Sequence, residues 1–329
     1  MKICFYALRE YDELVFCEKF KEKYGIDFVY STEYPNSKNI SLSKGCEGFS
    51  CTPFDLNSKV LEEFHNVGVK YVLCRSIGID HVDLKRAKEL GMKVDNVSYT
   101  PTGVADYAIM LMLACFRKLG HILERTKIQD YSLKNKLGRD FSYSTVGILG
   151  TGRIGTTVAK HLSGFGCKIL AYDICENNEI KKYADYVSLD EILSKSDVLT
   201  LHMSANDSNH HIINRDTISK MKNGVYIVNT ARGKLIDSKD LIEGIESGKI
   251  GGVALDVLEF EDGLYYHNRM GEVIVNPTLA VLKSFPNVIL TPHTAFYTQE
   301  DVGDMVECNF RSLYEFETGK KNYGFENSI

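Results

Sequence analysis

An arginine, a group of acids and a histidine stand at or just after the ends of three successive predicted strands in the last third of this 329-residue sequence. They are Arg232, then Asp256, Glu259 and Glu261, and finally His293. The carboxyl ends of parallel strands border the ligand crevice of a doubly wound sheet, so these side chains can meet there. A guanidinium binds a carboxylate in a bidentate fork, and an imidazole supplies the proton that a carbonyl oxygen needs when hydride reaches its carbon.

A carboxylate beside the imidazole stabilises its protonated form. Glu261 is suited to that place beside His293, and on spacing alone Asp256 and Glu259 compete with it. Each residue also has a plain structural alternative, because Arg232 can cap a turn and a lone histidine after a strand is commonly a hydrogen-bonded structural residue. Their joint placement on successive strand ends favours hydride exchange with a 2-oxo acid.

A glycine-rich turn indicates where the hydride comes from. Gly150, Gly152 and Gly155 form a G-x-G-x-x-G turn between an apolar strand at 145–149 and a helix predicted at 154–165. Backbone N–H groups at the start of that helix, including those of Arg153 and Ile154, can hold a pyrophosphate. The turn therefore predicts dinucleotide binding.

The next strand, at 168–173, ends in Asp173, which stands 18 residues after the last glycine of the turn. An acid there binds the adenosine ribose hydroxyls and repels a 2′-phosphate, although an ordinary strand-end aspartate is the alternative. No arginine or lysine follows directly in Ile174-Cys-Glu176. NAD is thus favoured over NADP. His202, at another strand end, either lines the cofactor cleft or fills the core, and the sequence does not separate the two.

Strand and helix candidates alternate along nearly the whole sequence, which predicts an α/β protein with two doubly wound parallel sheets. Helices at 103–118 and 119–133 lead into the second unit, and a helix at 298–318 returns to the first. The units are residues 1–100 plus 297–329, and residues 101–296 inserted between them. Strands are predicted at 2–8, 27–31, 48–51, 70–76 and 93–97, then at 145–149, 168–173, 198–203, 225–230, 252–257 and 288–291.

Composition excludes several classes of protein. The formal net charge is −5, from 39 basic and 44 acidic residues without a basic run, so nucleic acid and anionic membranes are not expected partners. The longest apolar run, 108–116, is half of what a bilayer span needs, and the N-terminus reads as a first strand rather than a signal peptide. The nine cysteines lack a C-x-x-C pair and are expected to be reduced thiols in a cytoplasmic protein, and no metal site is predicted.

Motifs along nearly the whole chain resemble those of the NAD-dependent D-2-hydroxyacid dehydrogenases, in the branch of D-lactate dehydrogenases and vancomycin-resistance dehydrogenases. The resemblance implies a Rossmann NAD domain inserted into a flavodoxin-like substrate domain. Its carriers, beside the glycine turn, are Arg75-Ser-Ile-Gly-Ile-Asp-His81, Val94-Asp-Asn-Val-Ser-Tyr-Thr-Pro101 with Val104-Ala-Asp106, Asn229-Thr-Ala-Arg-Gly233, Ala254-Leu-Asp256 with Glu261, and Pro292-His-Thr-Ala-Phe-Tyr297.

The resemblance also implies roles. Arg232 binds substrate, His293 is the acid/base, and Glu261 pairs with it because the acid of this branch lies five residues after the aspartate of Ala-Leu-Asp. Backbone N–H groups of Ile77 and Gly78 hold the substrate carboxylate. Tyr99 and Tyr297 wall the substrate pocket, where simple aromatic packing is the alternative. The remaining cofactor-binding candidates, beside the glycine turn and Asp173, are His202, Thr230, Ala231 and Asp256.

Two prolines of the common pattern are replaced, by Ser204 and Lys234. The stretch 48–55, where this branch sets the size of the accepted side chain, contains Phe49-Ser-Cys-Thr-Pro-Phe54. The predicted function is NADH-dependent reduction of pyruvate or a close relative to the D-2-hydroxy acid. Branched or aromatic 2-oxo acids are the alternative, and an NAD-sensing scaffold like the corepressor branch is a third. The resemblance implies that the helices at 103–133 form the arm of a homodimer.

Overall fold

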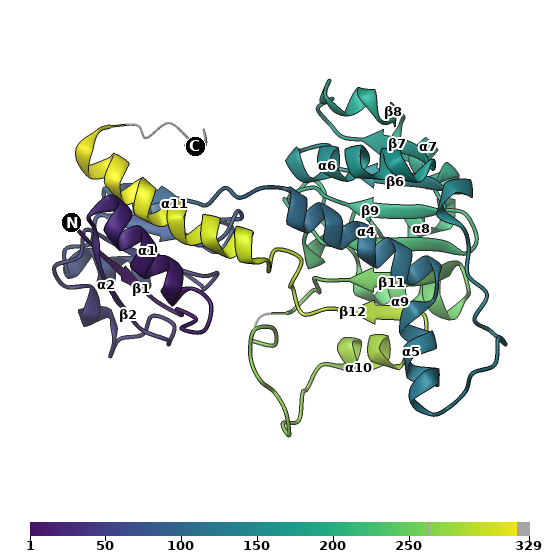
Figure 1. The fold of residues 1–329 in the computed structure, drawn as a ribbon, viewed down its shortest axis with the longest axis horizontal. Coiled ribbons are helices and arrows are strands. Elements are labelled where there is room, and N and C mark those ends of the chain that lie inside the picture. Colours follow the sequence, from purple (N-terminus) through teal and green to yellow (C-terminus); the bar gives the residue numbers. More distant parts are fainter. Residues whose placement is uncertain (262, 321–329) are drawn as a thin grey trace. The chain divides into compact units, whose positions relative to one another are not determined.

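The chain divides into two compact units, one of Met1–Thr100 with the chain from Tyr297 on, and one of Pro101–Phe296 (Figure 1). The computed structural model describes residues 1–261 and 263–320. Residues 321–329, which the sequence analysis assigns to the first unit, lie outside the described residues. Both sheets are entirely parallel, which confirms the predicted α/β class.

The first unit has a five-stranded sheet in the flavodoxin-like order β2-β1-β3-β4-β5. Side chains alternate across it, so Ile3 and Phe5 pack with α1 and α11, and Cys4 and Tyr6 pack with α2 and α3 on the other face. The strands are β1 Lys2–Phe5, β2 Asp27–Tyr30, β3 Gly48–Cys51, β4 Tyr71–Cys74 and β5 Lys93–Asp95, and the helices are α1 Leu14–Tyr24, α2 Ser58–Asn66, α3 Leu84–Glu89 and α11 Gln299–Thr318.

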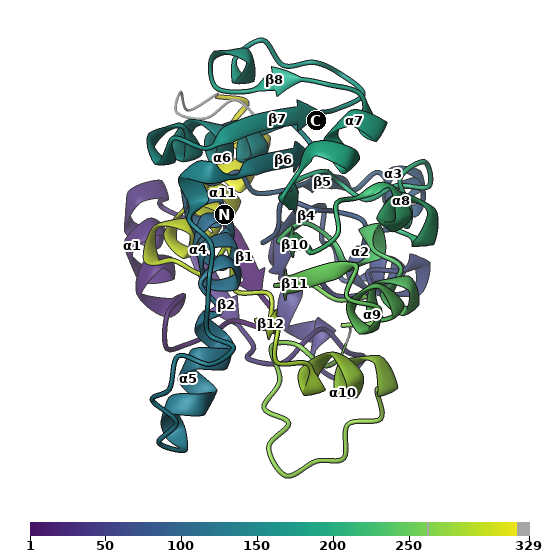
Figure 2. The same ribbon diagram turned by 90° about the vertical axis from the view of Figure 1, so that its right-hand side faces the viewer.

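The second unit has a seven-stranded sheet in the order β12-β11-β10-β9-β6-β7-β8. Six of these strands follow the Rossmann order, and β12 extends one edge of the sheet. The sequence predicts six strands in this unit, one too few, because it gives no sign of the two-residue β8. Figure 2 shows this sheet with its helices. The strands are β6 Thr145–Leu149, β7 Lys168–Tyr172, β8 Asp185–Tyr186, β9 Val198–Leu201, β10 Val225–Asn229, β11 Ile250–Leu255 and β12 Val288–Leu290.

Two hydrophobic cores hold the second unit together. Helices α4 and α6 pack on one face of the sheet, and α7 to α10 pack on the other. The central strand β6 is buried on both faces, which explains its continuous apolar sequence. The helices are α4 Thr102–Phe116, α5 Leu119–Lys127, α6 Arg153–Leu162, α7 Leu189–Lys195, α8 Arg215–Lys220, α9 Ser238–Glu246 and α10 Pro277–Ser284.

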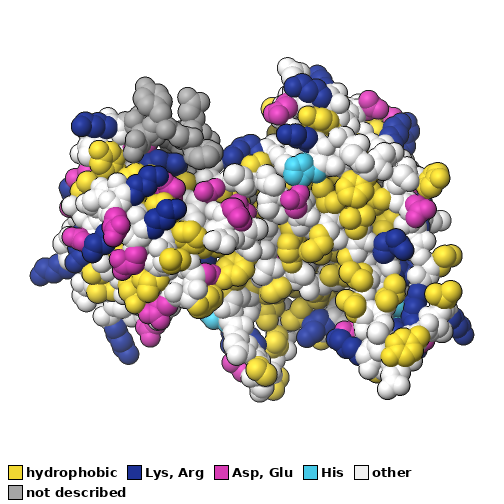
Figure 3. All heavy atoms as spheres, viewed as in Figure 1, with side chains coloured by type: hydrophobic (Ala, Val, Ile, Leu, Met, Phe, Trp, Pro, Cys, Tyr) yellow, Lys and Arg dark blue, Asp and Glu magenta, His cyan; other side chains and the backbone are white. Residues whose placement is uncertain are grey.

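Three helices end earlier than predicted, and α4, expected at 103–118, ends at Phe116. The helix expected at 119–133 ends at Lys127, and the α-helix expected at 154–165 ends at Leu162, followed by a 3₁₀ turn. Helix α5 has no buried side chain, and hydrophobic side chains gather on the surface over α4 and α5 (Figure 3). Among the described residues, no helix combines the length and the apolar character needed to cross a membrane. All nine cysteines are free thiols.

Candidate active site

Three neighbouring strands of the second unit end at the same edge of the sheet. The last residues of β10 and β11, Asn229 and Leu255, are register partners, and Leu255 is also the partner of Leu290 at the end of β12. The polar segments that follow these strands therefore begin side by side. They carry Arg232 and His293 together with the acids that follow β11.

His293 is paired with Glu261. The Nδ1 atom of His293 lies 2.7 Å from Oε1 of Glu261, and Oε2 of Glu261 accepts a hydrogen bond from the backbone N–H of Leu258 at 2.8 Å. Both side chains are partly buried, 25% and 22% exposed, so the pair is shielded from water on most sides and still reachable. Glu261 is thus a carboxylate that keeps one imidazole nitrogen of His293 engaged and leaves the other to a ligand.

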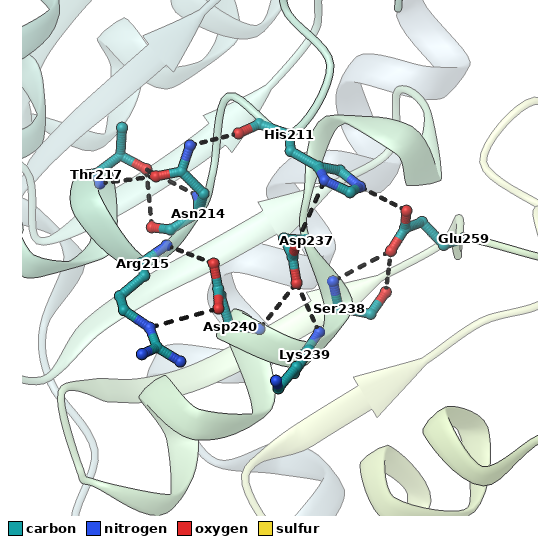
Figure 4. A network of polar contacts seen from close by, with 9 residues as sticks. All are labelled: His211, Asn214, Arg215, Thr217, Asp237, Ser238, Lys239, Asp240 and Glu259. Carbon is teal, nitrogen blue, oxygen red and sulfur yellow. Dashed lines mark hydrogen bonds and ion pairs between the residues drawn. The ribbon is translucent and has the colours of Figure 1, made fainter.

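Glu259 points to a different histidine. Its Oε1 atom lies 2.6 Å from Nε2 of His211, and its Oε2 atom accepts hydrogen bonds from the backbone N–H and hydroxyl of Ser238 (Figure 4). Of the three acids that compete for His293 on spacing, the structure brings Glu261 to its imidazole and turns Glu259 away.

Asp256 holds the loop that carries His293. Its side chain is fully buried, and its Oδ1 atom accepts hydrogen bonds from the hydroxyl of Thr291 at 2.6 Å and the N–H of Thr294 at 2.9 Å. Its Oδ2 atom accepts from the N–H of Ala295 at 2.9 Å, and its backbone oxygen accepts from the N–H of His293 at 2.8 Å. The family motif predicts Asp256 on the cofactor side, and local spacing gives no sign of these bonds, which support the His293 loop.

The side chain of Asn229, a residue not predicted to have a role of its own, holds the loop that carries Arg232 through two hydrogen bonds. Asn229 accepts a hydrogen bond from the N–H of Ala231 and donates one to the backbone oxygen of Arg232, both at 2.9 Å. A β-carbon on Gly233 would lie 2.1 Å from the carbonyl of Leu258, so this loop packs directly against the segment that leads to Glu261. The signal for Asn229 was its place in the Asn-Thr-Ala-Arg-Gly motif.

The glycine turn has the close contacts that a dinucleotide site needs. Gly150 has φ 96°, and a β-carbon there would lie 2.6 Å from the N atom of Met203, while one on Gly155 would lie 2.0 Å from the oxygen of Gly150. Gly152 instead borders open space and precedes α6, whose first N–H groups receive no side-chain cap. A pyrophosphate fits these N–H groups and this space.

Other cofactor candidates lie near the turn. Asp173 follows β7, and its Oδ2 atom accepts a hydrogen bond from the N–H of Thr151 at 2.6 Å. The Nε2 atom of His202 lies 2.9 Å from the hydroxyl of Thr200, and burial lowers the pKa of His202 to about 3, which keeps the ring neutral. Within the described ranges, the enclosed Nδ1 atom of His202 and the hydroxyl of Thr230 have no hydrogen-bond partner. Polar atoms of a bound dinucleotide fit as hydrogen-bond partners of these two atoms.

The first unit contains the remaining predicted residues. Ile77 and Gly78 lie in a turn after β4, where the hydroxyl of Ser76 donates to the oxygen of Gly78 at 2.7 Å and Asn96 donates to the oxygen of Ile77 at 2.6 Å. Ile77 is 40% exposed, as a ligand-binding turn requires.

The two predicted tyrosines differ in their surroundings. Tyr99 is buried, whereas Tyr297 is 42% exposed. The hydroxyl of Tyr297 donates to the carboxylate of Asp12, and the guanidinium of Arg9 lies 5.4 Å from its ring centroid. These contacts fix the orientation of the Tyr297 ring, and sequence analysis did not find Arg9 or Asp12.

Comparisons with known proteins identify the family of this chain. Residues 109–295 match the family described as D-isomer specific 2-hydroxyacid dehydrogenase, NAD binding domain. The chain is 43% identical to an aromatic 2-oxoacid reductase of Clostridium sporogenes over 96% of both proteins, and 36% identical to a D-lactate dehydrogenase of Lactiplantibacillus plantarum over 97% of this chain and 98% of that one. A D-lactate dehydrogenase structure from Treponema pallidum superposes with a TM-score of 0.88 at 35% identity, covering 97% of this chain and 98% of that one. The chain therefore belongs to the D-isomer specific 2-hydroxyacid dehydrogenase family and is an NAD-dependent D-2-hydroxyacid dehydrogenase.

Proposed function

We propose that His293 is the acid/base of the reaction, with Glu261 as its partner, and the 2.7 Å contact between them is the observation that carries this assignment. NADH, when bound, would supply the hydride that the carbonyl carbon of a 2-oxo acid needs. Glu261 stabilises the protonated imidazole, whose Nε2–H donates the proton to the carbonyl oxygen as negative charge develops there. The product is the D-2-hydroxy acid, and in the reverse direction the same imidazole removes the hydroxyl proton.

We propose further that Arg232 binds the substrate carboxylate, because only a planar guanidinium matches both carboxylate oxygens at once. Backbone N–H groups of Ile77 and Gly78 are proposed as further donors to the carboxylate, and Tyr99 and Tyr297 as walls of the substrate pocket. The proposed ligands of the pyrophosphate are Gly150, Gly152, Arg153, Ile154 and Gly155, and Asp173 is proposed to bind the ribose hydroxyls. His202, Thr230, Ala231 and Asp256 are proposed to contact the rest of the dinucleotide.

For the substrate, we propose a 2-oxo acid with a side chain larger than methyl, such as an aromatic or branched one. Cys51 is the register partner of Cys74, and the N–H of Arg75 bonds to its oxygen at 2.9 Å, so Thr52 stands at the strand end next to the Ser76–Gly78 turn. Thr52 is buried at this place, and its small side chain is proposed to leave the substrate side chain more room than a larger residue would. The 43% identity to an aromatic 2-oxoacid reductase supports the same assignment.

Pyruvate is the second candidate, because D-lactate dehydrogenases are among the relatives in both sequence and structure. The catalytic requirements are the same for both, since they differ only beyond the carbonyl carbon. The size of the side-chain pocket decides between them.

NADH oxidation by the purified protein with pyruvate, 2-oxoisocaproate and phenylpyruvate tests the proposal. We expect kcat/KM for phenylpyruvate or 2-oxoisocaproate to exceed that for pyruvate by about tenfold or more, the scale of discrimination that an apolar pocket gives. A preference for pyruvate would contradict the substrate assignment and leave the reaction intact. No oxidation with any of the three acids, while NADH still binds, would contradict the reaction and favour the NAD-sensing scaffold.

A further inference from the structure

His210, His211 and Glu259 form a cluster of possible metal ligands in the second unit, outside the residues to which the proposed reaction assigns a role. One ligand atom from each lies within 4.8 Å of the others. The two histidines stand in the segment between β9 and α8, and Glu259 stands after β11, so the cluster joins two segments that are distant in sequence. Its function is not explained by the reaction.

The two imidazoles are held next to each other by the backbone. Their ring centroids are 3.8 Å apart with an interplanar angle of 32°, and His211 has the left-handed φ of 52°. The N–H of His211 donates to the oxygen of Lys234 at 2.9 Å, and its oxygen accepts from the side-chain amide of Asn214 at 2.8 Å. These bonds anchor the backbone of His211, next to which His210 stands in the chain.

The atoms behind the cluster orient two of its three members (Figure 4). The Nδ1 atom of His211 lies 3.4 Å from Oδ2 of Asp237, and its Nε2 atom faces Oε1 of Glu259 at 2.6 Å. Ser238 donates two hydrogen bonds to the other oxygen of Glu259, whose side chain is only 10% exposed. A carboxylate behind a ligating imidazole and donors behind a ligating carboxylate are the outer contacts found around protein-bound metals.

We propose that His210, His211 and Glu259 bind a zinc ion. For Zn²⁺ to take the place of the proton between Nε2 of His211 and Oε1 of Glu259, this proton moves to Nδ1, which faces Oδ2 of Asp237, so the neutral imidazole and the carboxylate each offer a lone pair to the metal. A ring nitrogen of the exposed His210 completes three protein ligands, with water in the fourth position. Two imidazoles and one carboxylate suit Zn²⁺, whereas Mg²⁺ and Ca²⁺ prefer oxygen ligands throughout. The site goes beyond the proposed function and does not depend on it.

Sequence spacing gave no sign of this site, since Glu259 lies 48 residues after His211. The competing explanation is a structural His211–Glu259 hydrogen bond without a metal, and it makes no use of His210. His210 therefore separates the two explanations.

Zinc titration of the full-length protein against a chromophoric chelator tests the proposal. Cys175, an exposed thiol, is first replaced by serine, because a thiolate would bind zinc independently. We expect one equivalent of Zn²⁺ to bind, and His210→Ala and Glu259→Gln each to weaken binding about tenfold or more. His65→Ala, which removes an exposed histidine of the first unit, is the matched control and is expected to bind zinc as the parent does.

Two further readouts identify the ligands and the site. Co²⁺ in place of Zn²⁺ is expected to give the visible absorption of a tetrahedral nitrogen and oxygen site, which His210→Ala abolishes. His293→Gln is expected to retain full zinc binding, since His293 belongs to the other histidine–carboxylate pair. Equal affinity of the parent and His210→Ala, or loss of binding in His293→Gln, would overturn the proposal.

Discussion

His293 adopts a backbone conformation that few residues other than glycine tolerate, with φ 56°. Histidine is among the side chains that enter this region more often than others, and such a conformation persists only where the surroundings enforce it. Here the buried carboxylate of Asp256 binds the residues on both sides of His293, Thr291 and Thr294. Asp256 is accordingly a positioning residue for the imidazole.

Replacing His293 by glutamine is expected to lower kcat by about 10²–10⁴, the usual contribution of a general acid, while the Kd for NADH changes by less than about threefold. Steady-state kinetics and NADH fluorescence titration measure the two quantities. Glu261→Gln should lose less, because the amide oxygen still accepts a bond from Nδ1 and only the charge is removed. Unchanged turnover of His293→Gln would rule out the acid assignment.

Residue types and spacing predicted which residues belong to the site better than which groups their side chains contact. Arg232 and His293 could be named because strand ends are visible in the sequence, and the family motif selected Glu261. Spacing alone left Asp256 and Glu259 as competitors, since the direction of each side chain after β11 depends on how the loop turns. The contacts that distinguish Glu261 from Glu259 join each acid to a histidine 32 and 48 positions away in the sequence, and no local pattern predicts contacts over such distances.

At the scale of elements, every strand predicted from the sequence is present, and most of the ladders end earlier than predicted. β1 ends at Phe5, although Tyr6 to Leu8 are apolar and buried. Apolar residues indicate burial and not strand pairing, so the predicted strand extends beyond the observed one. The two-residue β8 was not predicted because it is too short to show a periodic pattern. The predicted helix at 119–133 is longer than α5 because an exposed helix has no apolar stripe that marks its end.

The ends of β3 and β4 are where substrate size should be decided. Thr52→Tyr places a larger side chain beside the Ser76–Gly78 turn, so we expect kcat/KM for phenylpyruvate to fall about tenfold or more while that for pyruvate changes by less than about threefold. Thr52→Ser is the matched control and should keep the preference of the parent. A parallel loss for both substrates would show that Thr52 does not set their size.

The first turn of α11 contains a carboxyl group with an unusual titration. Burial raises the pKa of Asp301 to about 6, with smaller contributions from Asp304 and Glu300, although its Oδ1 atom lies 3.4 Å from the hydroxyl of Thr100. Between about pH 4 and pH 6 the folded state then binds more protons than the unfolded state, so this group makes the protein less stable as pH rises through that window.

Asp301→Asn removes this titration, and the variant should therefore gain stability relative to the parent as pH rises from about 4.5 to 7. The gain is on the order of 1–3 kcal/mol, since one pKa unit corresponds to about 1.4 kcal/mol. Urea unfolding at both pH values measures it. Glu300→Gln, at an exposed acid of the same turn, is the control and should show no such gain, and a pH-independent difference for Asp301→Asn would contradict the assignment.

At the scale of the whole molecule, the arm after α4 presents apolar side chains that the chain itself leaves uncovered. Leu123, Ile128, Leu133 and Leu137 are all more than half exposed, in a stretch that begins with α5. We expect a second copy of the chain to cover them, in a dimer formed through the second unit. Exposed apolar side chains gathered in one segment in this way are typical of a subunit interface.

Light scattering after gel filtration should give twice the 37.1 kDa of the chain. Leu123→Ser combined with Ile128→Ser is expected to give the mass of one chain, because the interface loses its apolar contacts. Leu84→Ser, at an exposed leucine of the first unit, serves as the control. A parent protein that elutes with the mass of one chain would contradict the dimer.

The return of α11 to the first unit has a consequence for synthesis. Val306, Phe310 and Leu313 share one core with Ile3 and Phe5, so the earliest strand leaves the ribosome with α1 but long before α11, the second helix of that core. At about 5–20 residues per second, the delay is on the order of 15–60 s, during which residues 101–296 can already fold as a continuous segment. The apolar surface that α11 covers therefore stays exposed in the nascent first unit for that time, and we expect chaperones to bind this part of the chain.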